Sequence, residues 1–320
     1  VNLGTPEGTD YWSMRKYLKQ FLMDKRVVDI FRPLWWLILN GPILTFRPSK
    51  SGKAYQKIWD KENYGSPLRK FTINQTIKIK KIFKNYKNIS IDYAMRYGKP
   101  EIEKTLNKMT EKGCSKILLV PLYPQYAAST SATVKDEVFK WMLKQRWQPD
   151  LRTIAPWFDD QQYIKALAET IKKNIINKKN LDKLVVSFHG IPKRYFMAGD
   201  PYHCHCIKTA RLLKEELKWP DDKILVTFQS RFGPEPWLQP YTDETIIGLA
   251  KKGKKSIAVI APGFISDCLE TLEEINVEAR ELFIENGGES FEYIPCLNDN
   301  EYSIKFLEYI IKQNLLGWNF

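Results

Sequence analysis

The chain has 320 residues, and its 50 Lys and Arg against 37 Asp and Glu give a formal net charge of +13. This length is typical of two domains, and an apolar content of 43% is enough to form buried cores. The sequence lacks the run of about 18 apolar residues that a membrane-spanning helix needs, and it has no glycine-rich phosphate loop. Its five cysteines are irregularly spaced, which argues against a disulfide framework and indicates a reducing compartment.

The first predicted elements are a short strand at residues 1–3 and an apolar region with partly helical spacing. Since the chain begins inside this strand and without Met, the sequence leaves the native N-terminus and any targeting segment open. The region after the strand has apolar residues at helical spacing, followed by the apolar segment 30–39. We expect it to be either ordinary core or an apolar lip around a pocket or against a membrane.

A repeated pattern predicts two βαβ units in the rest of the chain. Each unit has a strand, an Arg-aromatic-Gly motif, a helix, a second strand and a proline. The copies are strand 89–94, Arg96-Tyr97-Gly98, helix 102–112, strand 116–120 and Pro121, and strand 223–228, Arg231-Phe232-Gly233, helix 242–252, strand 256–260 and Pro262. Continuous apolar strands between amphipathic helices are typical of parallel sheets covered on both faces, which predicts an α/β fold.

The repeat predicts two similar Rossmann-like domains, each a four-stranded parallel sheet flanked by helices and joined in the segment 147–156. The N-terminal α/β domain covers residues 1–152 and the C-terminal domain residues 153–305, which includes a further strand at 183–188. A last helix is expected at 300–314, and the C-terminal segment, about residues 306–320, is expected to pack back on the N-terminal domain. In such sheets ligands bind beyond the carboxyl ends of the strands, so chemistry is expected after each strand.

Two features that follow strands of the C-terminal domain could carry chemistry. His189 follows an apolar strand, and an imidazole there suits a general base as well as a hydrogen-bonded structural group. A helix is expected to begin at Ser266 or Asp267. It would place four carboxylates on one stripe, which is either a solvated face or a path for divalent metal ions or protons: Asp267, Glu270, Glu274 and Glu278.

The basic clusters and a Cys-His motif have plainer interpretations. The clusters at 78–84, 172–183 and 251–255 are interpreted as solvated helix faces, with attraction to an anionic membrane surface or substrate as the alternative. No nucleic-acid-binding motif accompanies them, so no nucleic-acid partner is expected. The run His203-Cys204-His205-Cys206 lacks the second ligand pair that a zinc site normally needs.

Several motifs, by their order and spacing, make nearly the whole chain resemble the ferrochelatases. The motifs are Asn2-Leu-Gly-Thr-Pro6, Gly65-Ser66-Pro67, Arg96-Tyr97, Tyr123-Pro-Gln-Tyr126, Ser187-Phe-His-Gly190, Gly199-Asp-Pro-Tyr202 and the segments 228–237 and 264–274. The resemblance implies an enzyme, a metal chelatase of the lyase class, that inserts Fe²⁺ into protoporphyrin IX with release of two protons. This is the terminal step of haem biosynthesis. The resemblance also implies a chelatase-like fold with a porphyrin cleft between its two domains.

The resemblance further implies roles for individual residues. His189 and Glu270 fall on catalytic positions, and both of them, with Asp267 and Glu274, are the implied metal-binding residues. The segment 21–23 falls on the lip that faces the membrane. The implied porphyrin-binding residues are Phe21, Leu22, Met23, Ser66, Arg96, Tyr97, Tyr123 and Trp237.

The resemblance implies protoporphyrin IX and Fe²⁺ as partners, with Fe²⁺ as substrate, and no tightly bound cofactor. Some ferrochelatases carry an iron–sulfur cluster on a C-terminal Cys triplet and one internal Cys. Here residues 315–320 contain no such triplet and Ala128 stands at the internal position, so no cluster is expected. The implied location is the cytoplasm, with transient peripheral contact to the inner membrane.

Alternatives stay open at this point. A coproporphyrin ferrochelatase or a cobalt chelatase would have the same fold, and a non-catalytic tetrapyrrole carrier would belong to a different functional class. The sequence does not decide the preferred porphyrin, the metal selectivity, the face by which the metal enters, or the oligomeric state.

Overall fold

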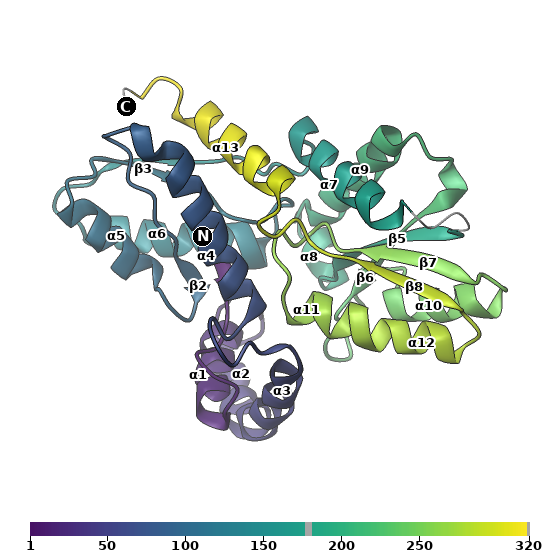
Figure 1. Ribbon diagram of the computed structural model, residues 1–320. Helices are drawn as coiled ribbons and strands as arrows, with labels where there is room; N and C mark the ends of the chain where they lie inside the picture. Colours follow the sequence, from purple (N-terminus) through teal and green to yellow (C-terminus); the bar gives the residue numbers. More distant parts are fainter. Residues whose placement is uncertain (177–180, 319–320) are drawn as a thin grey trace. The chain divides into compact units, whose positions relative to one another are not determined.

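The structure is a computed structural model that describes residues 1–176 and 181–318, and its chain divides into two compact units (Figure 1). Unit 1 comprises Val1–Leu122, Ala127–Ala155 and Leu307–Phe320, and unit 2 comprises Tyr123–Tyr126 and Pro156–Phe306. Part of the basic cluster 172–183 and the end of the predicted C-terminal segment lie outside the described residues, namely 177–180 and 319–320.

Unit 1 runs through several helices between its first and second strands. Its strands are β1 (Asn2–Gly4), β2 (Met95–Tyr97), β3 (Lys116–Leu119) and β4 (Asp150–Thr153). Its helices are α1 (Tyr11–Leu22), α2 (Arg32–Ile38), η1 (Leu39–Ile43), α3 (Leu44–Ile58), α4 (Pro67–Ile82), η2 (Phe83–Asn85), α5 (Ile102–Glu111), η3 (Ala128–Ala132) and α6 (Thr133–Lys144). Asp10 starts α1, because its carboxylate accepts hydrogen bonds from the N–H groups of Trp12 and Ser13, both at 3.0 Å.

The strands of unit 1 form two parallel pairs, β1 with β2 and β3 with β4. Val1 links the pairs, since its backbone nitrogen donates to the carbonyl of Val120 at 2.7 Å and its own carbonyl accepts from Leu122 N–H at 2.8 Å. In place of the predicted single four-stranded sheet, the described residues of unit 1 therefore form two pairs joined at one residue.

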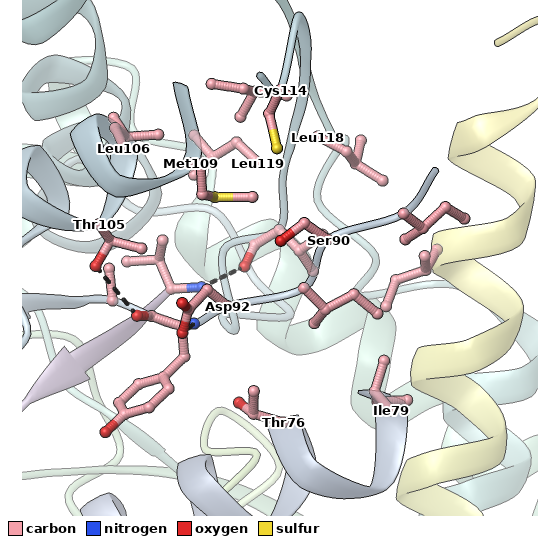
Figure 2. Close-up of a pocket in the computed structure, with 18 of the residues that line it drawn as sticks. Thr76, Ile79, Ser90, Asp92, Thr105, Leu106, Met109, Cys114, Leu118 and Leu119 are labelled. Carbon is pink, nitrogen blue, oxygen red and sulfur yellow. Dashed lines mark hydrogen bonds between the residues drawn. The ribbon is translucent and has the colours of Figure 1, made fainter. Parts of the chain in front are cut away.

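The predicted strand at 89–94 is wrong, because the strand in this region is β2, which starts at Met95. A strand needs a hydrogen-bonded partner, and β1 begins only at Asn2, opposite Met95. Residues 89–94 instead line a cavity of about 690 Å³, together with α4, α5, β3 and the helix α13 (Glu301–Leu315) (Figure 2). The predicted site residues, all of which are described, do not line this cavity.

Unit 2 contains one four-stranded parallel sheet in the order β6-β5-β7-β8. The strands are β5 (Lys183–His189), β6 (Ile224–Gln229), β7 (Ser256–Ile260) and β8 (Ser290–Ile294). The helices are α7 (Gln161–Ile175), α8 (Lys193–Met197), α9 (Tyr202–Leu217), η4 (Asp221–Lys223), α10 (Thr242–Lys251), α11 (Leu269–Leu272), η5 (Glu274–Ala279), α12 (Arg280–Glu285) and the start of α13 (Glu301–Leu315). Helices α7 and α9 cover one face of the sheet, and α10 and α12 cover the other (Figure 1).

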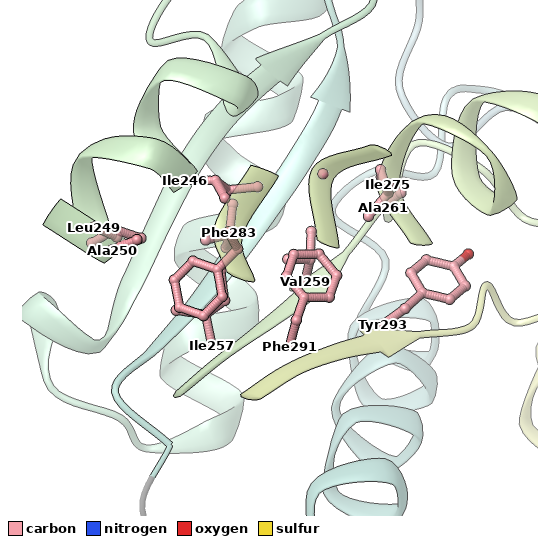
Figure 3. Close-up of a cluster of buried hydrophobic side chains, with 12 residues drawn as sticks. Ile246, Leu249, Ala250, Ile257, Val259, Ala261, Ile275, Phe283, Phe291 and Tyr293 are labelled. Carbon is pink, nitrogen blue, oxygen red and sulfur yellow. The ribbon is translucent and has the colours of Figure 1, made fainter. Parts of the chain in front are cut away.

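The core of unit 2 explains why its apolar strands were readable from the sequence. Five consecutive residues of β5 are buried, because this strand has a neighbour on each side and helices on both faces. On one face, side chains of α10 and α12 pack onto β7 and β8 (Figure 3). Phe283 of α12 is fully buried there, and burying a side chain of this kind contributes about 1.5–3 kcal/mol.

Two strands are not signalled by the sequence. β4 lies inside the segment 147–156 that was predicted to join the domains, and β8 lies just before the last helix. The four residues of β4 include Asp150 and Arg152, and none of the four is fully buried. A short strand without an apolar run gives no periodic signal, so only its pairing with β3 reveals it.

The two units share a local construction at their second strands. In unit 1 the N–H of Met95 donates to the carbonyl of Pro100, and in unit 2 the N–H of Phe228 donates to the carbonyl of Pro240, both at 2.8 Å. Met95 and Phe228 are therefore counterparts. The proline that accepts this hydrogen bond lies five positions after the donor residue in unit 1 and twelve positions after it in unit 2. Unit 2 therefore has the longer insertion.

This alignment corrects the one suggested by the Arg-aromatic-Gly motifs. The residue after Met95 is Arg96 and the residue after Phe228 is Gln229, so the counterpart of Arg96 is Gln229 and not Arg231. Arg231 lies on the surface, where it pairs with two acidic residues of α10. A shift of two positions along a strand preserves the side-chain period, which is why the motif alone did not reveal it.

The pairing of the first strands extends the correspondence. Asn2 lies opposite Met95, and Phe188 lies opposite Phe228. Leu3 is therefore the counterpart of His189, and Gly4 is the counterpart of Gly190.

The predicted acidic helix is present but interrupted. It consists of α11, the π-helix η5 and α12. Its N-cap residue is Cys268, which follows the predicted candidates Ser266 and Asp267, and the Cys268 N–H donates to Thr271 Oγ1 at 3.0 Å. Across residues 1–176 and 181–318, no helix combines the length and apolar character needed to cross a membrane.

Candidate functional site

His189 is the last residue of β5, at the carboxyl end of the unit 2 sheet. Its Nδ1 lies 2.6 Å from the carbonyl oxygen of Gly190. Because a carbonyl only accepts hydrogen bonds, Nδ1 carries the proton in this contact and Nε2 is the basic nitrogen. The ring centroid lies 6.5 Å from that of Trp237 and 6.4 Å from that of Phe264. The imidazole thus lies beside aromatic rings at a strand end.

Trp237, a predicted porphyrin-binding residue, is brought close to His189 by backbone pairing. Pro192 forms a β-bridge with Trp237, and the N–H of Leu238 donates to Ile191 at 3.0 Å. A Cβ on Gly190 would lie 3.0 Å from the Gln229 carbonyl and 3.1 Å from the indole. Glycine here allows the close approach of β6 and the indole to the strand end.

Glu270 and Glu274 lie on the start of the interrupted helix, and the structure brings them together. Burial raises the pKa of Glu274 to about 7, and the charges of Glu270 and Glu278 act in the same direction. The hydroxyl of Ser230 donates a hydrogen bond to Glu274 Oε2, which acts against this rise. The row therefore runs from Glu270 through a carboxyl that titrates near neutrality to the exposed Glu278.

Asp267, predicted to belong to the same row, is engaged elsewhere. Its buried carboxylate accepts hydrogen bonds from Tyr293 OH, Cys296 N–H (3.1 Å), Asn298 Nδ2 (2.6 Å) and Thr271 Oγ1 (3.3 Å). These contacts hold the start of α11 against the segment that follows β8. Within the described part of the chain, no three His, Cys, Asp or Glu side chains form a cluster that could hold a metal ion.

Gln229 lies in the segment after a predicted strand, where chemistry was expected, but it was not among the predicted site residues. It is the last residue of β6 and lies directly opposite His189. Its Nε2 donates to the carbonyl of Glu270 at 2.7 Å, and its Oε1 accepts from Ser187 Oγ at 2.7 Å. The sequence does mark its position, since Gln229 comes directly after a run of mostly apolar residues, just as His189 does.

In unit 1, Arg96 and Tyr97 meet at a carboxylate that the sequence interpretation also missed. Asp24 Oδ2 accepts hydrogen bonds from the Arg96 guanidinium, from Tyr97 OH at 2.9 Å and from the Thr133 hydroxyl. Burial would raise the pKa of Asp24, but the hydrogen bond from Thr133 and the charge of Arg96 hold it below its ordinary value. The predicted porphyrin positions Arg96 and Tyr97 are thereby fixed to the end of α1.

The predicted lip residues differ in exposure. Phe21 is partly exposed and lies edge-on to Tyr97, with ring centroids 5.0 Å apart. Leu22 is buried, and its carbonyl accepts from Trp35 Nε1 at 2.7 Å, whereas Met23 is partly exposed. The more exposed apolar side chains follow later, and those at least half exposed are Phe31 (74%), Leu34, Trp36, Leu37 and Phe46 (74%).

The segment Tyr123–Tyr126 belongs to unit 2, although both of its neighbours in the chain belong to unit 1. Two hydrogen bonds to α9 hold it: Gln125 Nε2 donates to Thr209 Oγ1 at 3.0 Å, and Tyr126 N–H donates to His205 Nδ1 at 3.2 Å. Tyr123 is buried in this segment. Ser66, the remaining predicted position, is the buried N-cap residue of α4 in unit 1.

The contacts of His205 explain much of the His-Cys-His-Cys motif. Its ring stacks on Phe158 with a centroid distance of 3.6 Å, and burial lowers its pKa. A neutral ring suits it as an acceptor for the backbone of Tyr126. Cys206 is fully buried in the same helix, and burial raises the pKa of its thiol.

Comparison with known proteins shows the family of this chain. The family model described as Ferrochelatase matches residues 1–315. The chain belongs to the ferrochelatase family. Its relatives include ferrochelatases of Allorhizobium ampelinum (56% identical over 99% of this chain and 93% of the relative) and Agrobacterium fabrum (53%, over the same shares). A ferrochelatase of Brucella ovis is 49% identical, over 99% of this chain and 91% of the relative.

Solved structures of chelatases share the fold. SirB from Bacillus subtilis with Fe³⁺ matches with a TM-score of 0.57 and 16% identity, over 79% of this chain and 93% of that one. CbiX, the terminal enzyme for siroheme biosynthesis in denitrifying bacteria, matches with a TM-score of 0.52 and 11% identity, over 78% of this chain and 94% of that one. These likenesses show the fold alone, and they confirm the predicted α/β chelatase-like class.

Proposed function

We propose that this member of the ferrochelatase family is a metal chelatase of the lyase class that inserts Fe²⁺ into protoporphyrin IX. The products are protohaem and two protons, and the reaction is the terminal step of haem biosynthesis. Family membership over residues 1–315 supports iron insertion into a porphyrin. The observation that carries the proposal is the meeting of His189, Gln229 and Glu270 at the carboxyl end of the unit 2 sheet.

The proposed chemistry follows from these groups. A free-base porphyrin holds two N–H protons that must leave as the metal enters the ring. The Nε2 of His189 accepts such a proton, because an imidazole with its proton on Nδ1 has a free lone pair on Nε2. Glu274, with a pKa of about 7, can both take and release protons, so the carboxylate row connects the site with the exposed Glu278.

Fe²⁺ enters this scheme as a substrate. We assign contact with it to His189, Glu270 and Glu274, and we place Asp267 behind them, where it holds the start of α11. Imidazole and carboxylates, unlike thiolates, give a site that suits delivery of iron rather than its storage. No tightly bound cofactor and no iron–sulfur cluster is part of the proposal.

The same proposal includes the porphyrin-binding residues and a contact with a membrane surface. The porphyrin-binding positions are those predicted above, with Trp237 beside His189 and with Arg96 and Tyr97 fixed by Asp24. The exposed apolar side chains between Phe31 and Phe46 support transient contact with a membrane surface. This contact corresponds to a cytoplasmic protein that is peripheral on the inner membrane.

The test is metal insertion by the purified chain under anaerobic conditions, with protoporphyrin IX and coproporphyrin offered separately. We expect Fe²⁺ and protoporphyrin IX to give the absorption spectrum of haem. Faster turnover of coproporphyrin would point to a coproporphyrin ferrochelatase, and insertion of Co²⁺ in preference to Fe²⁺ to a cobalt chelatase. Porphyrin binding without turnover of Fe²⁺, Zn²⁺ or Co²⁺ would contradict the enzymatic function and favour a carrier.

A further inference from the structure

Gln229 contacts the segments of both proposed catalytic residues. Its backbone lies opposite His189, and its carbonyl accepts from the N–H of Gly190 at 2.7 Å. Its side chain donates to the carbonyl of Glu270 at 2.7 Å. One residue therefore joins the strand end that carries the base to the helix start that carries the carboxylate.

Buried hydroxyl groups of the sheet and of α10 fix the orientation of the Gln229 amide. Its Oε1 accepts from Ser187 Oγ, and this hydroxyl lies 2.8 Å from Thr242 Oγ1, which contacts Thr227 Oγ1 at 2.9 Å. All of these side chains are buried, Ser187 and Thr227 completely. Since Ser187 supplies a donor to Oε1, the NH₂ end of the amide is the end that faces Glu270.

The helix that carries Glu270 depends on such outside contacts. α11 has only four residues before Glu273 and the π-helix η5, and so short a helix has few hydrogen bonds of its own. The residue after Gln229 holds the next carboxylate, because Ser230 donates to Glu274 from a left-handed backbone conformation with φ of +64°. A non-glycine residue in that conformation is strained and persists where its surroundings require it.

We propose that Gln229 is a positioning residue that sets the place of Glu270 relative to His189, an inference that rests on the proposed function of these two residues. Gln229 does not react itself. It fixes the start of α11 to the sheet, so that the carboxylate and the imidazole keep the spacing that metal insertion needs. Its counterpart Arg96 uses the same strand position in unit 1 to fix other elements, through Asp24 and Thr133.

The test compares the full chain with Gln229→Met, which is similar in length and loses both side-chain hydrogen bonds. We expect kcat for iron insertion to fall about 10–100-fold, as is usual when a residue that orients a metal ligand without contacting the metal is replaced. KM for the porphyrin should change less than about threefold. Amide hydrogen exchange should rise within 269–274 and stay unchanged in β5 and β7. Ser187→Ala, which frees only the far end of the amide, should lower kcat about threefold to tenfold.

Ile246→Val provides the matched control, since it trims a fully buried side chain of the unit 2 core that lies outside the site. It should lower stability and leave kcat unchanged. A Gln229→Met protein with wild-type kcat, or with protection lost across the whole sheet, would overturn the proposal. If Gln229→Met does not fold, a Ser187→Ala protein with wild-type kcat would also overturn the proposal. Absence of turnover in the wild type would instead refute the proposed function, and the exchange data would then decide the positioning role.

Discussion

Units 1 and 2 share a strand-end construction but place different chemistry on it. Where unit 2 has His189 at the end of its first strand, unit 1 has Leu3. Where unit 2 has the neutral Gln229, unit 1 has Arg96, whose charge is satisfied by Asp24. The same backbone geometry thus presents an imidazole and a carboxylate row in one unit and a closed ion-pair network in the other. The chemistry belongs to the side chains, while the shared construction only positions them.

The glycines at the carboxyl ends of the first strands, Gly4 and Gly190, give the largest expected difference. Gly4 has φ of +105°, and a Cβ there would lie 1.7 Å from the carbonyl oxygen of Tyr97, whereas a Cβ on its counterpart Gly190 would lie 3.0 Å from its nearest neighbour. Gly4→Ala should lower the free energy of unfolding by at least about 4 kcal/mol, and Gly190→Ala by about 1–2 kcal/mol. Urea denaturation followed by fluorescence measures both.

A control for this prediction is Gly113→Ala. Gly113 also has a positive φ, +85°, but a Cβ added there would meet nothing within 4 Å, so only the backbone conformation should cost free energy, about 1–2 kcal/mol. Equal losses for Gly4→Ala and Gly113→Ala would show that the close approach of β1 and β2 is unimportant.

Substitutions at the counterpart positions His189 and Leu3 distinguish a catalytic role from a structural one. His189→Ala should lower kcat about 10²–10⁴-fold, the usual contribution of a general base, and should retain porphyrin binding. Leu3→Ala, at the counterpart position, should cost stability but leave kcat within a few-fold of wild type. Steady-state metal insertion and fluorescence titration of porphyrin measure these effects. An active His189→Ala protein would remove His189 from the mechanism.

The next largest expected effect is a loss of stability when the ion-pair network of unit 1 is broken. Asp24→Asn leaves the nearly buried guanidinium of Arg96 without its close countercharge, which should lower the free energy of unfolding by about 3 kcal/mol. Glu137→Gln removes the more distant partner, 3.6 Å from Arg96, and should cost less than about 1 kcal/mol. Similar losses in the two variants would contradict the assignment of Asp24 as the main partner of Arg96.

The smallest effect concerns pH and the segment Tyr123–Tyr126. Burial lowers the pKa of His205, against the charges of Asp159 and Asp200 and together with that of Lys208. The unfolded chain therefore takes up a proton near pH 6.5 that the folded chain does not, so stability is complete above this pH and falls as the pH drops below it.

His205→Asn keeps an acceptor near Tyr126 but removes the titration. Between pH 7.5 and 5.5 the wild type should lose more unfolding free energy than this variant, by roughly a few tenths of a kcal/mol because partial exposure screens the effect. Parallel denaturation curves at the two pH values measure the difference. An identical pH dependence would mean that His205 does not titrate differently on folding.

The sequence by itself determined three strands of unit 2, its helices near 242–252 and 300–314, and the family. Lys183–His189 and Ser256–Ile260 were readable because strands buried on both faces are continuous apolar runs, which occur in few other structures. His189 was proposed as a site residue because it follows such a run directly. The sequence also placed Glu270 and Glu274 one helical turn apart, which local periodicity alone decides.

Tertiary structure alone decided which residues meet. Asp24 and Arg96 are far apart in the chain, as are Gln229 and Glu270, and no local pattern relates the members of either pair. It also decided that Asp267 turns toward the segment after β8, since the groups that hold it come from beyond that strand. Local spacing fixes periodicity within an element, but partners distant in sequence are fixed only by strand register and packing.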